Sequence, residues 1–315
     1  MRPLVFLRKT PNIDFMRLHI AGFAFSIVLT IASIVAFLSV GLNYGIDFVG
    51  GVLIEARSTS GPADLADMRQ KIDALHLGEN SLQGFGGPND VLIRLSRQPG
   101  GDAVQEKAVN AVRQALGATI EFRRVEVVGP KVGEELIRAG VLATVLALLA
   151  IAAYVWFRFE WQFGVGAMIS TAHDVITTVG LFAIFQLEFN LTTLAAILTV
   201  AGYSINDTVV IYDRVRETMR KYRTMDFKLL INLSLNETLS RTILTVMTVA
   251  LAVLSLLLFG GEVLRGFSIA MLWGIVIGTY SSLFIAAPLL YYIRPKRGTE
   301  TKKAAGAEGA AERVS

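Results

Sequence analysis

Long apolar runs without charge are the feature that most constrains this chain. Five stretches contain no Lys, Arg, Asp or Glu: residues 18–46, 139–157, 189–206, 242–261 and 266–293. The hydrocarbon core of a bilayer is about 30 Å thick and is crossed by about 20 residues of apolar helix, so each stretch is long enough to span it. A sixth run, 161–187, is interrupted only by His173 and Asp174. The sequence therefore predicts a multi-pass α-helical membrane protein with six transmembrane helices.

The six predicted spans divide the 315 residues into membrane and non-membrane segments. The spans are 18–41, 139–157, 163–186, 190–212, 242–260 and 266–292. Four longer segments lie outside them: an N-terminal segment 1–17, a domain 42–138, a loop 213–241 and a tail 293–315. The tail is polar and low in complexity, which predicts disorder.

Lys and Arg concentrate in 1–17, 213–241 and 293–315, whereas the short connection at 186–190 has neither. Because basic residues favour the cytoplasmic side, both termini are predicted to be cytoplasmic. We attribute the net charge of +4 to this bias and expect no nucleic-acid binding. The absence of cysteine excludes disulfides and thiolate metal sites. We expect no metal, no cofactor and no enzymatic activity.

Residues 42–138 have the composition of a soluble domain, with 11 basic and 13 acidic side chains by count. Residues 51–58 and 119–128 have strand patterns, and 62–77 and 101–117 have helical patterns. Between the two helices, "SLQGF" and "DVLIRLS" flank the turn signal "GGPN". The order β-α-β-β-α-β predicts a small α+β, ferredoxin-like domain. The topology places this domain outside the cytoplasm, in the periplasm.

Three ionisable residues in or near the predicted spans suggest a function. Asp174 lies near the middle of the third span, Asp207 in the cytoplasmic half of the fourth, and Arg241 at the start of the fifth. An ionisable group in the membrane costs about 2.5 kcal/mol or more and commonly marks an ion pathway or a proton relay. We therefore treat these three residues as candidates for a proton path.

Helical geometry extends this candidate site. Tyr203 lies one turn before Asp207, while Asn206 and Asp207 are expected to face the bundle interior. On the fifth span, Thr245 shares a stripe with Arg241, so we expect the two polar stripes to face each other. Movement of Arg241 toward or away from Asp207 would then change the proton affinity of the carboxylate. The alternative is a purely structural Asp207–Arg241 pair.

The neighbouring residues carry more ordinary interpretations. Asp213 and Arg214 are expected at the membrane interface, where charged side chains are common. Apolar residues at helical spacing predict an interfacial helix over 224–240, lying along the membrane surface before the fifth span. Gly274 and Gly278 form a pair of small residues suited to close helix packing in the sixth span.

Several long motifs, in register with all six spans, resemble the SecF family. Its members are the smaller membrane subunits of bacterial SecD–SecF complexes and are relatives of the resistance-nodulation-division (RND) exporters. The motifs are "NYGIDFVGG" (43–51), "VVGPKVGEEL" (127–136), "HDVITTVG" (173–180), "GYSINDTVVIYDRVRE" (202–217), "NLSLNETLSRTILT" (232–245) and "IGTYSSLFIAAPLL" (277–290).

The resemblance implies a role in protein export at the bacterial inner (cytoplasmic) membrane. Together with SecD, its obligate partner, such a subunit would use the proton motive force to promote late steps of preprotein translocation by SecYEG and SecA. YajC and YidC are further implied partners, and preproteins and protons are the implied substrates. The positions that match the family's proton-path residues are Asp207 and Arg241, with Asp174 from another motif of the same membrane domain.

Three other functions are weighed against this one. An RND-type exporter of lipid or small molecules usually has two six-helix halves, so the length of this chain argues against it. An intramembrane aspartyl protease could use Asp174 and Asp213, but the sequence lacks a Gly-x-Gly-Asp-like second site. A purely structural scaffold of the translocon stays open, because a buried Asp–Arg pair can serve packing alone.

Overall fold

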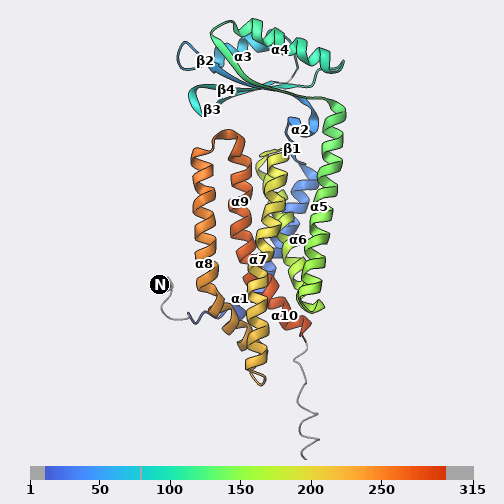
Figure 1. Ribbon diagram of the computed structural model, residues 1–315, viewed down its shortest axis with the longest axis vertical. Coiled ribbons are helices and arrows are strands. Elements are labelled where there is room, and N and C mark those ends of the chain that lie inside the picture. The colour runs from blue at the N-terminus through green and yellow to red at the C-terminus, as the bar shows by residue number, and fades with distance from the viewer. Residues whose placement is uncertain (1–10, 79, 296–315) are drawn as a thin grey trace, which may run out of the picture.

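A bundle of long helices supports a small sheet domain at one end (Figure 1). The structure is a computed structural model that describes residues 11–78 and 80–295. The predicted disordered part of the tail, 296–315, lies outside the described residues. We call the end of the bundle beneath the sheet domain the sheet end, and the opposite end the far end.

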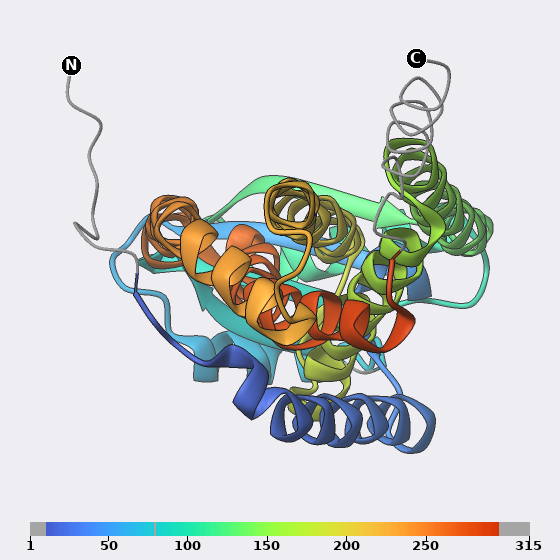
Figure 2. The ribbon, with the colours of Figure 1, turned by 90° about the horizontal axis from the view of Figure 1, so that it is seen from below.

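Within the described residues, six helical segments are long and apolar enough to cross a membrane, which confirms the predicted class. They are α1 (Phe15–Ser39), α5 (Pro130–Arg158), α6 (Trp161–Phe185), α7 (Leu191–Lys221), α8 (Phe227–Phe259), and α9 (Gly261–Ser281) continued by η1 (Ser282–Ala286) and α10 (Ala287–Ile293). Viewed from the far end, α1 and α5 lie at the edges of the bundle and α9 lies within it (Figure 2).

The sixth span is interrupted by one wide turn. In η1 the Ala287 N–H donates to the Ser282 carbonyl, five residues earlier, instead of the usual four. Pro288 follows directly and has no N–H to donate, so regular α-helical bonding cannot pass through this position. Such π turns occur often at functional sites, and this one lies against α1, α6 and α7.

Close packing of α9 on α7 depends on the two predicted small residues. A Cβ atom at Gly274 would overlap the Val200 side chain of α7, and one at Gly278 would lie 3.2 Å from Ser204 Cβ. Val200 and Ser204 are both fully buried there. The structure thus confirms that Gly274 and Gly278 bring the two backbones together.

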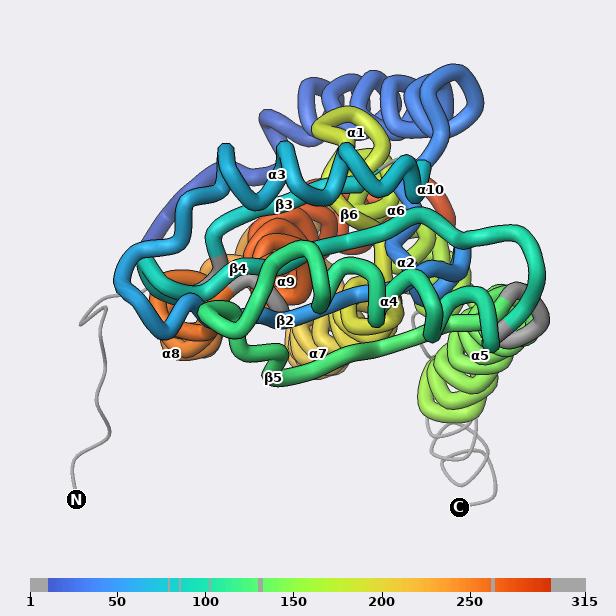
Figure 3. The backbone as a smooth tube through the Cα atoms, turned by 90° about the horizontal axis from the view of Figure 1, so that it is seen from above, coloured from blue at the N-terminus to red at the C-terminus, as the bar shows by residue number. Residues whose placement is uncertain are grey.

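The sheet domain has the predicted ferredoxin-like order. It comprises β2 (Gly51–Ser58), α3 (Leu65–Asp73), β3 (Asn80–Phe85), β4 (Gly87–Ser96), α4 (Asp102–Leu116) and β5 (Ile120–Val128). The sheet is antiparallel with order β3-β4-β2-β5. Seen from above, α3 and α4 cover its outer face (Figure 3). Strand alternation places Val52 and Ile54 in the core beneath these helices, while Leu53 and Glu55 face the bundle.

Short elements join the sheet domain to the bundle. β1 (Asn43–Tyr44), which follows α1, pairs in parallel with β6 (Glu188–Phe189), between α6 and α7. α2 (Ile46–Val49) then leads into β2 and packs on the start of α5. Gly133 of α5 lies directly against the Phe48 carbonyl, where a Cβ atom would come within 2.6 Å of the oxygen. The two covalent links to the sheet domain therefore run side by side.

The expected surface helix over 224–240 is instead the first part of α8, which is continuous from Phe227 to Phe259. The apolar positions that we expected to face the membrane surface instead pack in the bundle core. Fully buried there are Leu230, Ile231 and Leu235. The polar positions of the same segment hold the first turn of α1 and the chain just before it. Asn232 Oδ1 accepts from the Met16 N–H at 2.9 Å, and Asn236 Oδ1 accepts from the Ile13 N–H at 2.8 Å.

We expect Gly274→Ala to destabilise the protein, because the new methyl group would overlap Val200. Overpacking of this kind costs about 1–3 kcal/mol. The matched control is Gly164→Ala in α6, where no atom lies within 4 Å of the added Cβ. The measurement is the midpoint of thermal unfolding of the detergent-solubilised protein. Equal midpoints for the two variants would contradict the packing argument.

Candidate functional site

Among the described residues of the helical bundle, Asp174 is the most buried carboxylate, and it is the centre of a polar cluster. It lies in the middle of α6 and is fully buried. Its Oδ2 accepts from Ser204 Oγ of α7 at 2.5 Å and from Ser281 Oγ of α9 at 2.7 Å. Its Oδ1 accepts from His173 Nδ1 at 2.9 Å. Three donors thus satisfy one carboxylate, and they tie three helices together.

Two further bonds continue this contact along α7 toward the far end. Thr208 and Ser282 hydroxyls lie 2.8 Å apart, and the Tyr212 hydroxyl donates to the Ala286 carbonyl at 3.1 Å. Ser204, Thr208 and Tyr212 are spaced four residues apart and therefore share one face of α7. Ser204 bonds Asp174 of α6, whereas the partners of Thr208 and Tyr212 both lie in the π turn. The wide turn of the sixth span is thus held by hydrogen bonds to α7.

Asp207 is less completely satisfied than Asp174. Its Oδ1 accepts from Thr242 Oγ1 of α8 at 2.8 Å. Its Oδ2 is buried and has no hydrogen-bond partner among the described residues. The side chain is half-buried, and it lies one turn farther from the sheet end than Ser204. A buried oxygen without a partner is uncommon, and here it leaves one carboxylate atom available to bind a proton.

The structure changes the expected surroundings of Asp207. No ion pair between Asp207 and Arg241 occurs among the described residues, and the Arg241 side chain is exposed. The Thr245 hydroxyl donates to the Arg241 carbonyl of its own helix at 3.0 Å. The physical reason is rotation about the helix axis: Thr242 faces α7, so Arg241, one residue earlier, points about 100° away.

Asn206 does not face the bundle interior, and that expectation was wrong. Its side chain is exposed, whereas its neighbours Ile205 and Thr208 are buried. The buried face of α7 follows Val200, Ser204 and Thr208, and Asn206 lies outside this stripe.

Thr242, Ser204 and Ser281 are the carboxylate-binding residues that sequence reasoning missed. The signal for Thr242 was present, because it follows the buried Thr238 by four residues and so continues its face toward α7. Ser204 and Ser281 gave no comparable signal, because serine is common in membrane helices as a neutral packing residue. Only the position of Asp174 between α7 and α9 shows that they donate to a carboxylate.

Asp213 and Arg214 form ion pairs near the far end of the bundle. Arg158 of α5 donates to Asp213 at 2.7 Å, and both side chains are exposed. Arg214 donates to Glu237 of α8 at 2.7 Å and to Glu217 at 2.6 Å. These contacts join helix ends, which agrees with their expected structural role.

The comparisons with known proteins agree with this architecture. A family described as "Protein export membrane protein SecD/SecF, C-terminal" matches residues 108–296, and one described as "SecD/SecF GG Motif" matches residues 35–61. The protein translocase subunit SecF of Cereibacter sphaeroides is 47% identical over 300 residues, which cover 92% of each chain. The subunit of the same name in Rickettsia akari is 46% identical, over 91% of this chain and 94% of the relative.

A solved structure shows the same arrangement within a longer chain. The crystal structure of SecDF, a translocon-associated membrane protein from Thermus thermophilus, matches with a TM-score of 0.77 and 33% sequence identity. The match covers 91% of this chain but only 39% of that chain. A second SecDF structure, in a form described as super-membrane-facing, matches with a TM-score of 0.70.

We expect Asp174→Ala to destabilise the protein strongly, because it leaves Ser204, Ser281 and His173 without their common acceptor. Loss of such a buried cluster should cost about 3 kcal/mol. Asp213→Ala is the control, since it removes a carboxylate from an exposed ion pair, which contributes about 0–1 kcal/mol. Thermal unfolding in detergent measures both. A loss at Asp174 no larger than at Asp213 would contradict the assigned role of the cluster.

Proposed function

Because this chain belongs to the SecD/SecF family of protein-export membrane proteins, we propose that it acts as a SecF-type subunit of a Sec export complex. Together with SecD it uses the proton motive force to promote late steps of preprotein translocation by SecYEG and SecA across the inner membrane. Identity to SecF subunits over most of the chain supports the export role.

The single observation that supports proton coupling is the partly satisfied carboxylate of Asp207. Thr242 holds one oxygen at 2.8 Å, while the other oxygen is buried without a partner. Such a carboxylate can take up a proton at Oδ2 without breaking its contact with α8. A proton that moves down the membrane potential supplies about 2.3 kcal/mol per 100 mV. Asp207 is therefore our proposed proton-binding residue.

Arg241 is our proposed proton-releasing residue. It directly precedes Thr242 and its side chain is exposed. A rotation of α8 that turns Arg241 toward Asp207 would replace the threonine hydroxyl by a guanidinium. Because a nearby positive charge favours the ionised carboxylate, this rotation would expel the proton. Asp174, in contrast, has three donors, and we propose that it positions α7 rather than carrying the proton.

An exposed polar stripe supports association with SecD. On α7, Thr199, Gly202 and Asn206 are exposed at helical spacing, and on α8 Arg241 and Thr248 are exposed. Polar groups at this depth are costly when they face lipid. Asn206 and Arg241 directly precede Asp207 and Thr242 in the sequence, so a partner subunit that covers the stripe would also cover the proposed proton site. The SecDF chain, of which this chain spans 39%, carries additional sequence that such a partner could provide.

The proposed topology follows from the charge distribution. The end of α7 and the start of α8 are rich in Arg and Lys and lie at the far end, so we place this end in the cytoplasm and the sheet domain in the periplasm. The same proposal includes contacts of the chain with SecYEG, YajC and YidC.

We expect Asp207→Asn to abolish proton-gradient-stimulated export, because the amide cannot take up a proton. The measurement is preprotein export into membrane vesicles with and without an imposed proton gradient. Asp213→Asn is the control and should keep the stimulation, and both variants should still co-purify with SecD. Unchanged stimulation in Asp207→Asn would overturn proton coupling at this residue and would favour a structural scaffold.

A second pair of variants tests the contact of Asp207 with α8. We expect Thr242→Val to reduce gradient-stimulated export several-fold, since it removes the hydroxyl that positions Asp207. Thr245→Val lies one turn away on the same helix and removes a hydroxyl that bonds its own backbone, so export should stay near the wild-type level. The same vesicle assay measures both variants. A larger loss of export in Thr245→Val than in Thr242→Val would contradict the role of Thr242 in positioning Asp207.

A further inference from the structure

The covalent links of the sheet domain serve only one half of its sheet. The chain enters through α2 into β2 and leaves from β5 into α5, and Gly51 pairs with Val128 where the two links meet. Gly50 and Gly51 have φ values of 80° and 143°, which are accessible mainly to glycine. β3 and β4 form the other half of the sheet and lack a direct covalent link to the bundle.

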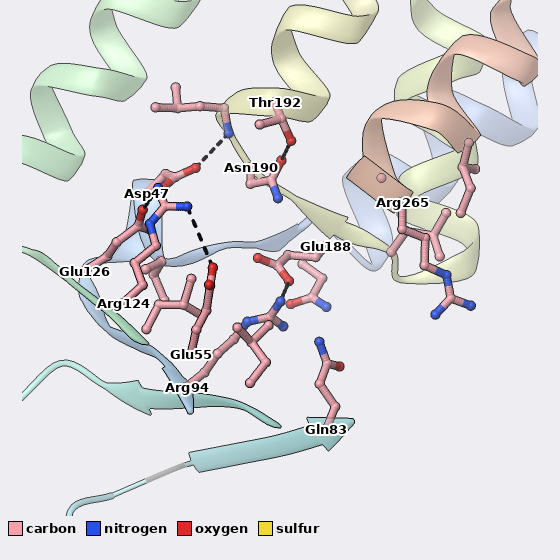
Figure 4. Close-up of a pocket in the computed structure, with 18 of the residues that line it drawn as sticks. Asp47, Glu55, Gln83, Arg94, Arg124, Glu126, Glu188, Asn190, Thr192 and Arg265 are labelled. Carbon is pink, nitrogen blue, oxygen red and sulfur yellow. Dashed lines mark hydrogen bonds and ion pairs between the residues drawn. The ribbon is translucent and has the colours of Figure 1, made fainter. Parts of the chain in front are cut away.

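An ion pair connects this second half to the bundle. Arg94 of β4 pairs with Glu188 of β6, the two-residue strand between α6 and α7 (Figure 4). Both side chains are partly exposed, at 29% and 23%. The backbone on the Glu188 side is firmly held, because β6 pairs with β1 and the Phe189 carbonyl accepts from the Gly45 N–H at 2.8 Å.

A cavity of about 540 Å³ surrounds this pair. It separates the bundle-facing side of the sheet, at Leu53 and Leu92, from Ile269 of α9. Its charged lining residues come from the sheet, from α2, from β6 and from α9: Asp47, Glu55, Arg94, Arg124, Glu126, Glu188 and Arg265. The sheet therefore meets this part of the bundle through charged groups across a gap, and domains joined this way move relative to one another.

The local electrostatics disfavour the ionised form of Glu188. Burial raises the pKa of Glu188, an effect that Arg94 opposes and that the nearby charge of Asp47 reinforces. Because the net pKa shift is upward, the loss of solvation outweighs the attraction of Arg94. Within the cavity Arg124 is paired with Glu55 at 3.7 Å and with Glu126.

Glu188 lies close to the start of the helix that carries Asp207. Two residues later, Asn190 caps α7 by accepting from the Thr193 N–H at 3.0 Å. Asp47 of α2 accepts from the Leu191 N–H at 2.9 Å (Figure 4). A displacement of β6 would therefore be felt directly in the first turn of α7.

We propose that Arg94 and Glu188 form a releasable latch between the sheet domain and the start of α7, and that the latch must open during each transport cycle. The proposal deepens the export function given above and rests on it for the existence of a cycle. Opening separates the β3–β4 half of the sheet from β6, while the links at β2 and β5 act as the hinge.

The absence of cysteine from the chain allows a direct test. A variant with Arg94→Cys and Glu188→Cys carries two thiols, which a reducible bifunctional methanethiosulfonate reagent can bridge in vesicles that contain the complex with SecD. The matched control is Arg57→Cys with Asp90→Cys, an ion pair between β2 and β4 that lies entirely within the sheet domain. Both pairs are treated with the same reagent.

We expect bridging of positions 94 and 188 to remove gradient-stimulated export, and reduction to restore the level of the unbridged variant. Bridging of positions 57 and 90 should leave export unchanged. Undiminished export with the 94–188 bridge in place would overturn the latch. If Asp207→Asn also keeps its stimulation, the proposed function itself fails; if Asp207→Asn loses stimulation, only the latch fails.

A charge reversal tests the contact without cysteine chemistry. Arg94→Glu and Glu188→Arg should each reduce export, because like charges then face each other across the cavity. The double reversal should recover most of the loss while SecD co-purification stays constant. No recovery in the double variant would contradict the ion pair as the contact that matters.

Discussion

The buried carboxylate of Asp174 is the interaction on which the rest of the bundle depends. A charged group in the membrane interior is tolerated only when protein donors replace water. Three side chains from α6, α7 and α9 converge on it and fix the relative height of these helices. Gly278, which lies against Ser204, allows the close approach that these hydrogen bonds need. Packing and polar satisfaction are therefore two aspects of one contact.

The two membrane carboxylates have different surroundings, and this difference separates their roles. Asp174 accepts three hydrogen bonds and is inaccessible, so a change in its protonation would disturb three helices at once. Asp207 accepts one hydrogen bond and keeps one oxygen unpaired, next to a face that is polar and exposed. A proton can bind there at a small structural cost. The sequence alone shows two aspartates in apolar segments, and only their neighbours distinguish the carboxylate that joins three helices from the one that we propose to bind a proton.

Much of the fold was predictable because its signals are local. Charge-free length predicted the six spans, and alternation and turn residues predicted the ferredoxin-like order, including β2 at residues 51–58. The ends of the helices were harder to predict, because α7 and α8 continue as buried helices past the length that is needed to span a membrane. An apolar helix face has the same residue spacing whether it packs against lipid or against protein. The spacing of Leu230, Ile231 and Leu235 therefore could not show that they are buried within the bundle.

The candidate site was predicted only in part, because side-chain orientation depends on how each helix is rotated. Asp207 was identified from its charge alone, whereas the expected partners Arg241 and Thr245 differ from the observed partner Thr242 by one and three positions. The contact between Arg94 and Glu188 could not be predicted at all. Its members are 94 positions apart and belong to different domains, and no periodicity connects them.

α7 is held by contacts of unequal strength along its length. Near its middle, Ser204 and Thr208 form hydrogen bonds in a dry interior, where loss of a partner costs about 1–3 kcal/mol for each group. Near its start, a single, partly exposed ion pair joins Glu188 to Arg94 of the sheet domain, whereas the central contacts connect several helices. On our proposal, a force on the sheet domain breaks this outer contact before the central ones. Because the central contacts persist, α7 and α9 would respond together, and the Asp207 face would shift against α8, where one hydroxyl holds it.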